Sequence, residues 1–253
     1  MDIECPILGG PETCCGTLHN HFGDTALELQ TAKTGLSSIR RAKPTTVLSI
    51  CPDCDESFNK HAPRKNSFKV SNISELLVTH LDQLKKLMRP LNRKIVIHYH
   101  DVNEVRRRDT ENLHKIMGAI PGVTILPSEH ARGPGVHCNV LGPMLVEDQV
   151  AMFKEAEELG ADTIVVPYHS CYRQHLVMEL VSPVRVNHYF ELVAESLDLS
   201  FDEPHKKLRL LNDIDAALDV LRPRMEQLGY TRDEVRPLLE WGVYGWPSPA
   251  MNV

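Results

Sequence analysis

Apolar and polar positions along the chain follow two periods, one typical of buried strands and one typical of amphipathic helices. Short β-branched, apolar runs predict buried strands over residues 44–50, 94–99 and 162–168. Apolar residues spaced three or four positions apart predict helices over residues 24–35, 74–88, 110–122 and 147–160. For the first of these helices, Asp24 is the expected N-cap and Gly35 the expected end. Because strands and helices alternate, we expect α/β layers with largely parallel strands.

The two halves of the chain repeat one pattern. The aligned segments are 45–54 with 162–171, and 68–81 with 184–197. The first pair matches Thr46 with Thr163 and Cys54 with Cys171 at an offset of 117 residues, and the second pair has an offset of 116. Strand, loop and helix match in the same order, so the sequence predicts two pseudo-symmetric repeated halves, each a mostly parallel sheet flanked by helices.

A helical tail follows the repeat. Leucine and isoleucine positions over residues 208–221 predict an amphipathic helix, and Thr231 with Glu234 forms the capping box of another. The expected regions are 1–92 for the first half, 93–200 for the second half and 201–253 for the tail.

Composition narrows the classes of function. The 253 residues carry a net charge of −6, which argues against a nucleic-acid partner. We find no signal-peptide pattern and no apolar run of membrane-spanning length, so we expect a cytoplasmic protein without a membrane span. Structural disulfides are disfavoured there, and cysteines at fixed spacings more often bind metals or carry redox chemistry.

Four cysteines of the first half form two closely spaced pairs. Cys14 and Cys15 are adjacent and precede a glycine, and Cys51 and Cys54 form a CxxC motif directly after a predicted strand. Loops at the carboxyl ends of parallel strands converge at one edge of a sheet, so we expect the four thiols to meet. Four thiolates suit an iron–sulfur cluster or zinc. Four structural cysteines, or a thioredoxin-like CxxC pair, are the alternatives.

Histidines accompany the cysteines of the second half. The candidate residues are His98, His100, His137, Cys138, His169 and Cys171. Mixed histidine and cysteine sets ligate zinc and other divalent metals, and Asp101 is a candidate to support such a ligand. Alternatively, His100, His137 and His169 deliver protons beside a redox site. A third interpretation is a decayed site in which the histidines only hydrogen-bond within loops.

The cysteine segments resemble a known family. "CCGTLHNHFGD" and "VLSICPDCDESFNKH" are similar to the two signature segments of the cysteine-rich CCG-domain family. That family includes the cysteine-rich subunit of heterodisulfide reductase and iron–sulfur subunits of glycerol-3-phosphate, lactate and succinate oxidising systems. "IHYHDVNEVRRR", "IMGAIPGV" and "GVHCNVLGP" look like later family segments in the same order, and the resemblance covers roughly residues 5–197.

The resemblance implies a [4Fe–4S] cluster bound by Cys14, Cys15, Cys51 and Cys54. The family motif also has a cysteine far upstream, and Cys5, nine positions before Cys14, is too near to fill that place. Both a non-cubane and a cubane cluster therefore stay open, as does a further ligand from a partner subunit. In the second half, where the family has three more cysteines, this chain has other residues, and Cys138 and Cys171 remain.

The leading hypothesis is an iron–sulfur subunit of a heterodisulfide-reductase-like complex that carries electrons for disulfide, thiol or sulfur-compound redox chemistry. The sequence has no glycine-rich nucleotide fingerprint, so electrons would be exchanged with a flavin or iron–sulfur partner subunit. The alternative is a non-catalytic assembly subunit with a structural zinc or a degenerate second site.

Overall fold

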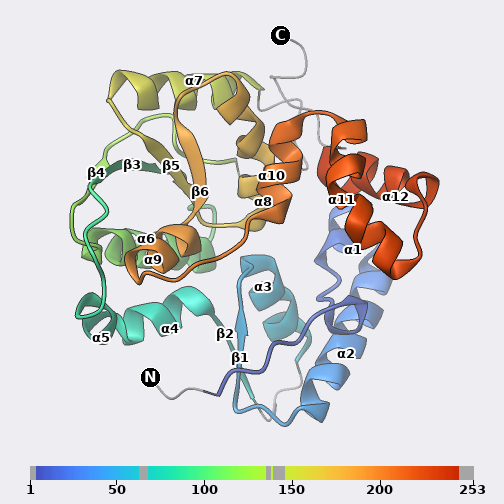
Figure 1. Cartoon of the computed structure of the whole chain (residues 1–253). Coiled ribbons are helices and arrows are strands. Elements are labelled where there is room, and N and C mark those ends of the chain that lie inside the picture. Colours follow the sequence, from blue (N-terminus) through green and yellow to red (C-terminus); the bar gives the residue numbers. More distant parts are fainter. Residues whose placement is uncertain (1–3, 63–67, 135–137, 139–145, 245–253) are drawn as a thin grey trace. The chain divides into compact units, whose positions relative to one another are not determined.

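The computed structural model describes residues 4–62, 68–134, 138 and 146–244 (Figure 1). The chain divides into two compact units, Met1–His80 and Leu81–Val253, which are described separately below as unit 1 and unit 2. Each unit contains a parallel sheet flanked by helices, so the predicted α/β class is confirmed.

Unit 1 is built on a two-stranded parallel sheet. Strand β1 (Thr46–Ser49) pairs with β2 (Lys69–Asn72), and α3 (Pro52–His61) connects them. The other helices of this unit are η1 (Pro11–Thr13), α1 (Thr17–His21), α2 (Thr25–Arg41) and α4 (Ile73–Thr79). The core of unit 1 contains Leu36, Phe58 and Val70, which come from α2, α3 and β2.

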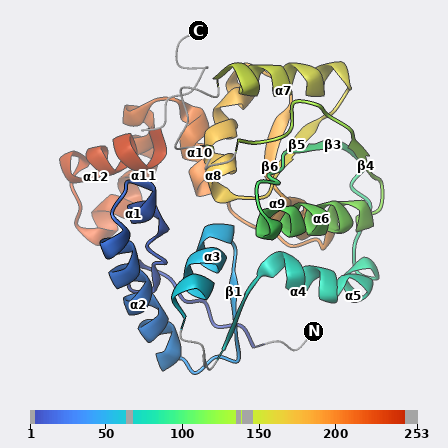
Figure 2. The ribbon, with the colours of Figure 1, turned by 180° about the vertical axis from the view of Figure 1, so that it is seen from behind.

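Helix α2, the long blue helix in Figure 2, begins where the sequence predicts and ends later. The Asp24 side chain accepts a hydrogen bond from the Leu27 N–H at 2.9 Å, which confirms the N-cap. The expected end at Gly35 is wrong, because the helix continues to Arg41. A Cβ atom at Gly35 would lie 2.5 Å from the Cys14 carbonyl oxygen. The glycine therefore makes room for a neighbouring segment and does not stop the helix.

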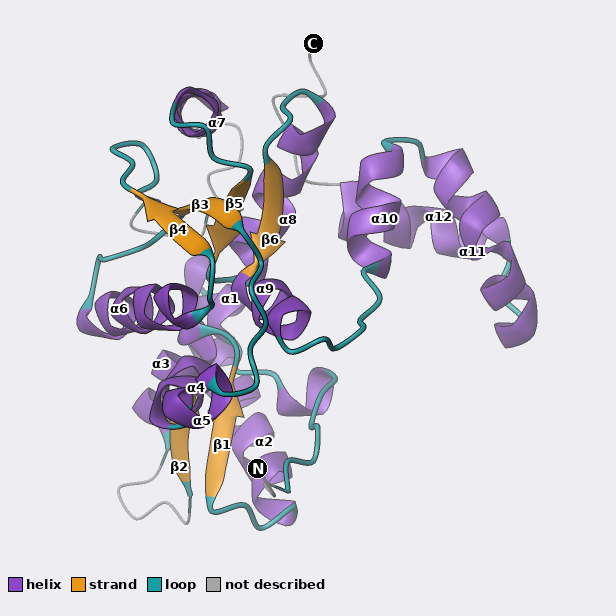
Figure 3. Cartoon of the chain, turned by 60° about the vertical axis from the view of Figure 1, so that its left-hand side comes forward, coloured by secondary structure: helices purple, strands orange, loops and turns teal. Residues whose placement is uncertain are grey.

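Unit 2 contains a four-stranded parallel sheet in the order β4-β3-β5-β6 (Figure 3). Its strands are β3 (Arg93–Ile97), β4 (Val123–Leu126), β5 (Thr163–Val166) and β6 (Arg185–His188). The chain runs from β3 to β4 on one side and then returns to place β5 on the other side of β3. Neighbouring crossovers leave in opposite directions there, so a crevice is expected at the carboxyl ends of β3 and β5.

Helices cover both faces of this sheet. Among the described residues, the helices before the tail are α5 (Leu81–Lys85), α6 (Glu104–Ala119), α7 (Val146–Glu158), α8 (His169–His175), η3 (Leu176–Leu180) and α9 (Tyr189–Ser196). Helices α6 and α9 lie side by side on one face, and α7 lies on the other (Figure 1). The single helix expected over residues 74–88 is wrong, because His80 leaves the helical conformation between α4 and α5.

The structure repeats the order strand, helix, strand, helix. Strands β1 and β5 begin 117 residues apart, as do α3 and α8, and strands β2 and β6 begin 116 residues apart. Cys54 and Cys171 are each the third residue of their helix. The alignment predicted from the sequence therefore places equivalent elements on one another.

The tail consists of α10 (Pro204–Leu211), α11 (Ile214–Leu228), α12 (Arg232–Leu239) and η4 (Glu240–Tyr244). The single helix expected over residues 208–221 is wrong: Asn212 adopts a left-handed conformation and ends α10, and Asp213 caps α11. The predicted capping box of Thr231 and Glu234 is confirmed at the start of α12. None of the helices in the described residues is long and apolar enough to cross a membrane.

Candidate metal and redox sites

The Cys14–Gly16 turn of unit 1 is held between α2 and α3. Gly16 has a positive φ of 77°, and a Cβ atom there would lie 2.7 Å from the Glu28 carbonyl oxygen. On the other side of the turn, the Ser57 hydroxyl donates a hydrogen bond to the Cys15 carbonyl oxygen at 2.6 Å. The glycine of the CCG motif is therefore required both by backbone conformation and by close packing.

The first turn of α3 brings the CxxC motif to this turn. Cys51 is the N-cap of the helix and Cys54 lies in its first turn. The Cys54 and Cys15 sulfur atoms are 3.2 Å apart, and the Thr17 hydroxyl donates to the Asp53 carbonyl oxygen at 3.2 Å. The N-terminus of a helix carries partial positive charge, so this position favours an anionic group bound beside it.

The hydrogen bond between the two sulfur atoms shifts the pKa values of the two thiols in opposite directions. It lowers the pKa of Cys15 to about 6. It raises the pKa of Cys54, which also hydrogen-bonds Cys51 and is partly desolvated. The Cys54 thiol thus donates to the Cys15 sulfur, and Cys51 is the next thiol in the same chain of contacts.

The four cysteines differ in exposure. Cys15 and Cys51 are buried, Cys54 is half-buried and Cys14 is exposed. The Cys14 sulfur accepts a hydrogen bond from the Gly16 N–H at 3.4 Å. The structure therefore gathers Cys15, Cys51 and Cys54 inside unit 1 and places Cys14 at its surface.

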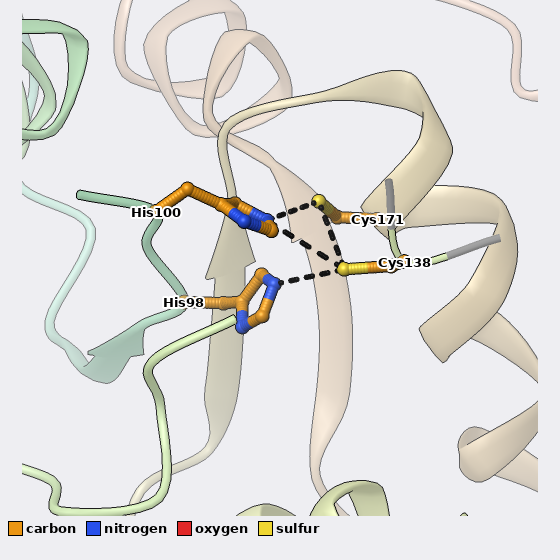
Figure 4. Close-up of side chains that lie close together, drawn as sticks. All are labelled: His98, His100, Cys138 and Cys171. Carbon is orange, nitrogen blue, oxygen red and sulfur yellow. Dashed lines mark hydrogen bonds between the residues drawn. The ribbon is translucent and has the colours of Figure 1, made fainter. Parts of the chain in front are cut away.

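A second group of ligands lies in unit 2 and consists of His98, His100, Cys138 and Cys171 (Figure 4). One ligand atom from each residue lies within 4.8 Å of the others, and all four residues are buried. Such a group could hold a metal ion.

The fold explains why these residues meet. His98 and His100 follow β3 at alternate positions, so they share one face of the extended chain. Cys171 lies in the first turn of α8, which follows the neighbouring strand β5. The group therefore lies at the carboxyl ends of β3 and β5, where the sheet topology favours a ligand site.

The contacts within the group are short. His100 Nε2 lies 3.2 Å from Cys171 Sγ and 3.6 Å from Cys138 Sγ. His98 Nε2 lies 3.4 Å from Cys138 Sγ, and the two sulfur atoms are 3.6 Å apart. Each histidine thus presents its Nε2 atom to a thiol.

A loop after β4 fixes the orientation of His100. Its Nδ1 atom hydrogen-bonds the Pro134 carbonyl oxygen at 2.9 Å. A Cβ atom at Gly133 would lie 2.7 Å from His100 Nε2, so the absence of a side chain leaves room for the ring. The Gly133 N–H donates to the Tyr99 carbonyl oxygen at 2.7 Å, which holds the loop against the end of β3.

Burial favours the neutral form of His98 and His175. It lowers the pKa of His98 to about 4 and that of His175, whose ring contacts His98, to about 3. For His100, burial lowers the pKa, but the interaction with Cys171 and the hydrogen bond to the Pro134 carbonyl oxygen outweigh it, and the pKa is raised. Burial also raises the pKa of Cys171 to about 11.

A small pocket adjoins the group and is lined in part by His98, Cys138, Gln149 and His175. Three buried polar atoms, His98 Nδ1, Gln149 Oε1 and His175 Nε2, have no hydrogen-bond partner among the described residues. Gln149 and His175 did not stand out in the sequence, because a single polar residue in a helix pattern resembles any solvent-facing position.

The other residues expected at this site lie away from the ligand group or outside the described residues. His137 lies outside the described residues. His169 is exposed at the first position of α8 and is not a member of the compact ligand group. Asp101 pairs with Arg132, with Oδ1 and Nε 2.9 Å apart.

Residues 1–59 match the model of the CCG cysteine-rich domain family. The match takes in Cys14, Cys15, Cys51 and Cys54 and ends within α3. No curated protein matches the chain. CCG domains occur in redox iron–sulfur proteins, and with the His/Cys group of unit 2 the match indicates a metal-binding protein.

Proposed function

We propose that this chain is an iron–sulfur subunit of a heterodisulfide-reductase-like complex, with a [4Fe–4S] cluster bound by Cys14, Cys15, Cys51 and Cys54. The observation that carries the proposal is the meeting of the two cysteine segments, with Cys15 and Cys54 in contact, inside the region that matches the CCG family. A bound cluster supplies one-electron transfer. Two such transfers and two protons reduce a disulfide to two thiols, and a flavin or iron–sulfur partner subunit provides the electrons.

The residues around the four thiols fit this group. Thiolates are the usual ligands of iron–sulfur clusters, and the first turn of α3 offers a helix N-terminus beside Cys51 and Cys54. Gly16 and Gly35 let the Cys14–Gly16 turn lie close to α2. The Ser57 and Thr17 hydroxyls then hold that turn against α3. The two cysteine segments are therefore held side by side before any cluster binds.

Exposure assigns different roles to the ligands. Cys15 and Cys51 are buried and would shield one side of the cluster from water, whereas the exposed Cys14 would mark the side that a partner subunit or substrate reaches. This arrangement leaves room at the surface for a further ligand from a partner.

Anaerobic purification with iron and acid-labile sulfide analysis tests the proposal. We expect about four irons and four sulfides per chain, a broad visible absorption band and an EPR signal after one-electron reduction. Cys15→Ser and Cys54→Ser should each lower the iron content several-fold. Cys5→Ser is the matched control, because Cys5 is an exposed cysteine outside the ligand set and its loss should leave iron unchanged.

An anaerobic preparation that contains no iron after reconstitution with iron and sulfide would overturn the proposal. So would a Cys15–Cys54 disulfide that forms and is reduced reversibly without iron, since that result assigns the pair to dithiol chemistry.

A non-catalytic assembly subunit is the second candidate. The buried His/Cys group of unit 2 favours it, because four protein ligands leave no place for a substrate. That candidate predicts zinc without iron in the purified chain, so the same elemental analysis separates the two.

A further inference from the structure

We propose that His98, His100, Cys138 and Cys171 bind a single zinc ion in a closed tetrahedral site. This site is separate from the cluster proposed for unit 1 and does not depend on it. Its ligand set is narrower than the candidates expected from the sequence, since it takes His98 and His100 and does not include His137 or His169.

The separations between ligand atoms fit one tetrahedral ion. With Zn–S bonds of about 2.3 Å and Zn–N bonds of about 2.0–2.1 Å, neighbouring ligand atoms are expected roughly 3.4–3.8 Å apart. The observed Cys138–Cys171 separation is 3.6 Å, and the three histidine–cysteine contacts are 3.2, 3.4 and 3.6 Å. The ligands are thus already gathered at the spacing that zinc requires.

The four ligands of unit 2 converge on one point. All four ligand atoms here lie within 4.8 Å of one another. The group has space for one ion.

Charge and protonation also favour zinc. Two thiolates neutralise a divalent cation, so the bound site carries no net charge into the core of unit 2, where both cysteines are fully buried. Two imidazoles complete a Cys₂His₂ set, which is a common composition of structural zinc sites. Binding would release the protons of Cys138 and Cys171.

The surroundings of His100 are those of a metal ligand. A ligating histidine usually donates its other ring N–H to a carbonyl or carboxylate, and His100 Nδ1 meets the Pro134 carbonyl oxygen. In the neutral ring this bond assigns the proton to Nδ1, so Nε2, which faces the two sulfur atoms, is available to a metal ion. Gly133 leaves the space that the ring needs. In this proposal His100 therefore binds the ion and does not deliver protons.

A site with four protein ligands is closed, so its role is to hold the fold. The bound ion would link the end of β3, the loop after β4 and the first turn of α8. These segments meet at the switch point of the sheet.

Metal analysis of the full chain after dialysis against a chelator tests the site. We expect one zinc per chain, and replacement by Co²⁺ should give the visible bands of a tetrahedral cobalt–thiolate centre. Cys171→Ala and His100→Ala should lower the retained zinc at least ten-fold. His169→Ala separates the two ligand sets: full zinc retention supports the site proposed here, and its loss overturns it.

Two further variants keep the test decisive if a ligand variant folds poorly. His98→Cys preserves four donors, so it should retain zinc and strengthen the thiolate-to-cobalt absorption from two sulfurs to three. His114→Ala is the matched control, since His114 is an exposed histidine on α6. The proposal is wrong if the folded wild-type chain retains no zinc, if it binds iron with sulfide at this site, or if His98→Cys leaves the cobalt spectrum unchanged.

Discussion

Gly35 lies so close to Cys14 that a methyl group on Gly35 would come within 2.5 Å of the Cys14 carbonyl oxygen. Gly35→Ala should therefore push the Cys14–Gly16 turn away from α2. We expect a loss of about 1–3 kcal/mol in stability, the usual range for overpacking, and a lower iron content after reconstitution. Thermal unfolding with iron analysis measures both effects.

Gly118→Ala is the control for this substitution. The nearest atom to its added methyl group would be Ile125 Cδ1 at 3.9 Å, which is ordinary contact. Alanine is the better helix former, so this variant should gain about 0.5–1 kcal/mol. A Gly35→Ala variant that behaves like Gly118→Ala would contradict the close packing of the turn.

Gly133→Ala tests the loop that positions His100. Its methyl group would overlap the imidazole ring, which must then turn away from the two sulfur atoms. We expect zinc affinity to fall about 10–100-fold, as for other groups that orient a metal ligand. Competition with a colorimetric chelator measures the affinity, and unaltered binding would show that the ring does not depend on this space.

Lys206, in α10 of the tail, contacts the sheet of unit 2. Its ammonium group lies 2.8 Å from Glu179 Oε1 and donates to the Val186 carbonyl oxygen, and both charged side chains are nearly buried. Lys206→Met should cost about 2–3 kcal/mol, because it leaves the Glu179 carboxylate without its cation.

Urea unfolding compares this variant with Lys154→Met. Lys154 pairs with Glu158 at the surface of α7, where both side chains are mostly exposed, so its loss should change stability by less than about 0.5 kcal/mol. Equal effects of the two substitutions would contradict a buried ion pair at the tail.

The raised pKa of the Glu191 carboxyl should make the folded state less stable as pH rises. Burial, together with the neighbouring Glu203, raises its pKa to about 7. The folded state therefore favours the protonated carboxyl, and this contribution is complete below the ordinary pKa near 4.5 and lost as pH rises through 7. Between pH 5 and 8 we expect a loss on the order of 1–2 kcal/mol.

Glu191→Gln should remove this loss, since glutamine keeps an acceptor for the His188 N–H without a charge. The nearby His188 acts in the opposite direction. Burial lowers its pKa to about 4, so its contribution to stability grows as pH rises from 4 to 6.5. The difference between wild type and Glu191→Gln at each pH isolates Glu191, and parallel pH curves would refute its raised pKa.

Periodicity located β1, β3 and β5 and the longer helices, because burial on one face leaves a direct pattern in the sequence. It did not identify β2, β4 and β6, which are only four residues long. Periodicity failed where tertiary contacts or a local backbone conformation determine where a helix ends. Gly35 resembled a helix end, and only the position of Cys14 shows why a glycine stands within α2. The expected tail helix is divided by Asn212, whose left-handed conformation is not visible in a pattern of leucines.

The candidate sites were accessible from sequence to different degrees. The positions of the two cysteine pairs, at the ends of predicted elements, were enough to predict that Cys15 and Cys54 lie close together. The compact group of unit 2 needed the strand order, because β3 and β5 are neighbours in the sheet although β4 lies between them in the chain. The loop residues Gly133 and Pro134 carry no metal-binding signal of their own.

Because α3 and α8 are equivalent, the ligand positions of one half show where ligands could be introduced in the other. Tyr168 occupies the N-cap position in α8 that Cys51 occupies in α3, and Cys171 matches Cys54. The residues that select an ion lie at strand ends and helix starts, whereas the strands beneath them only support those positions. A duplicated ancestor could thus acquire different inorganic chemistry in each copy through a few loop substitutions, with its architecture intact.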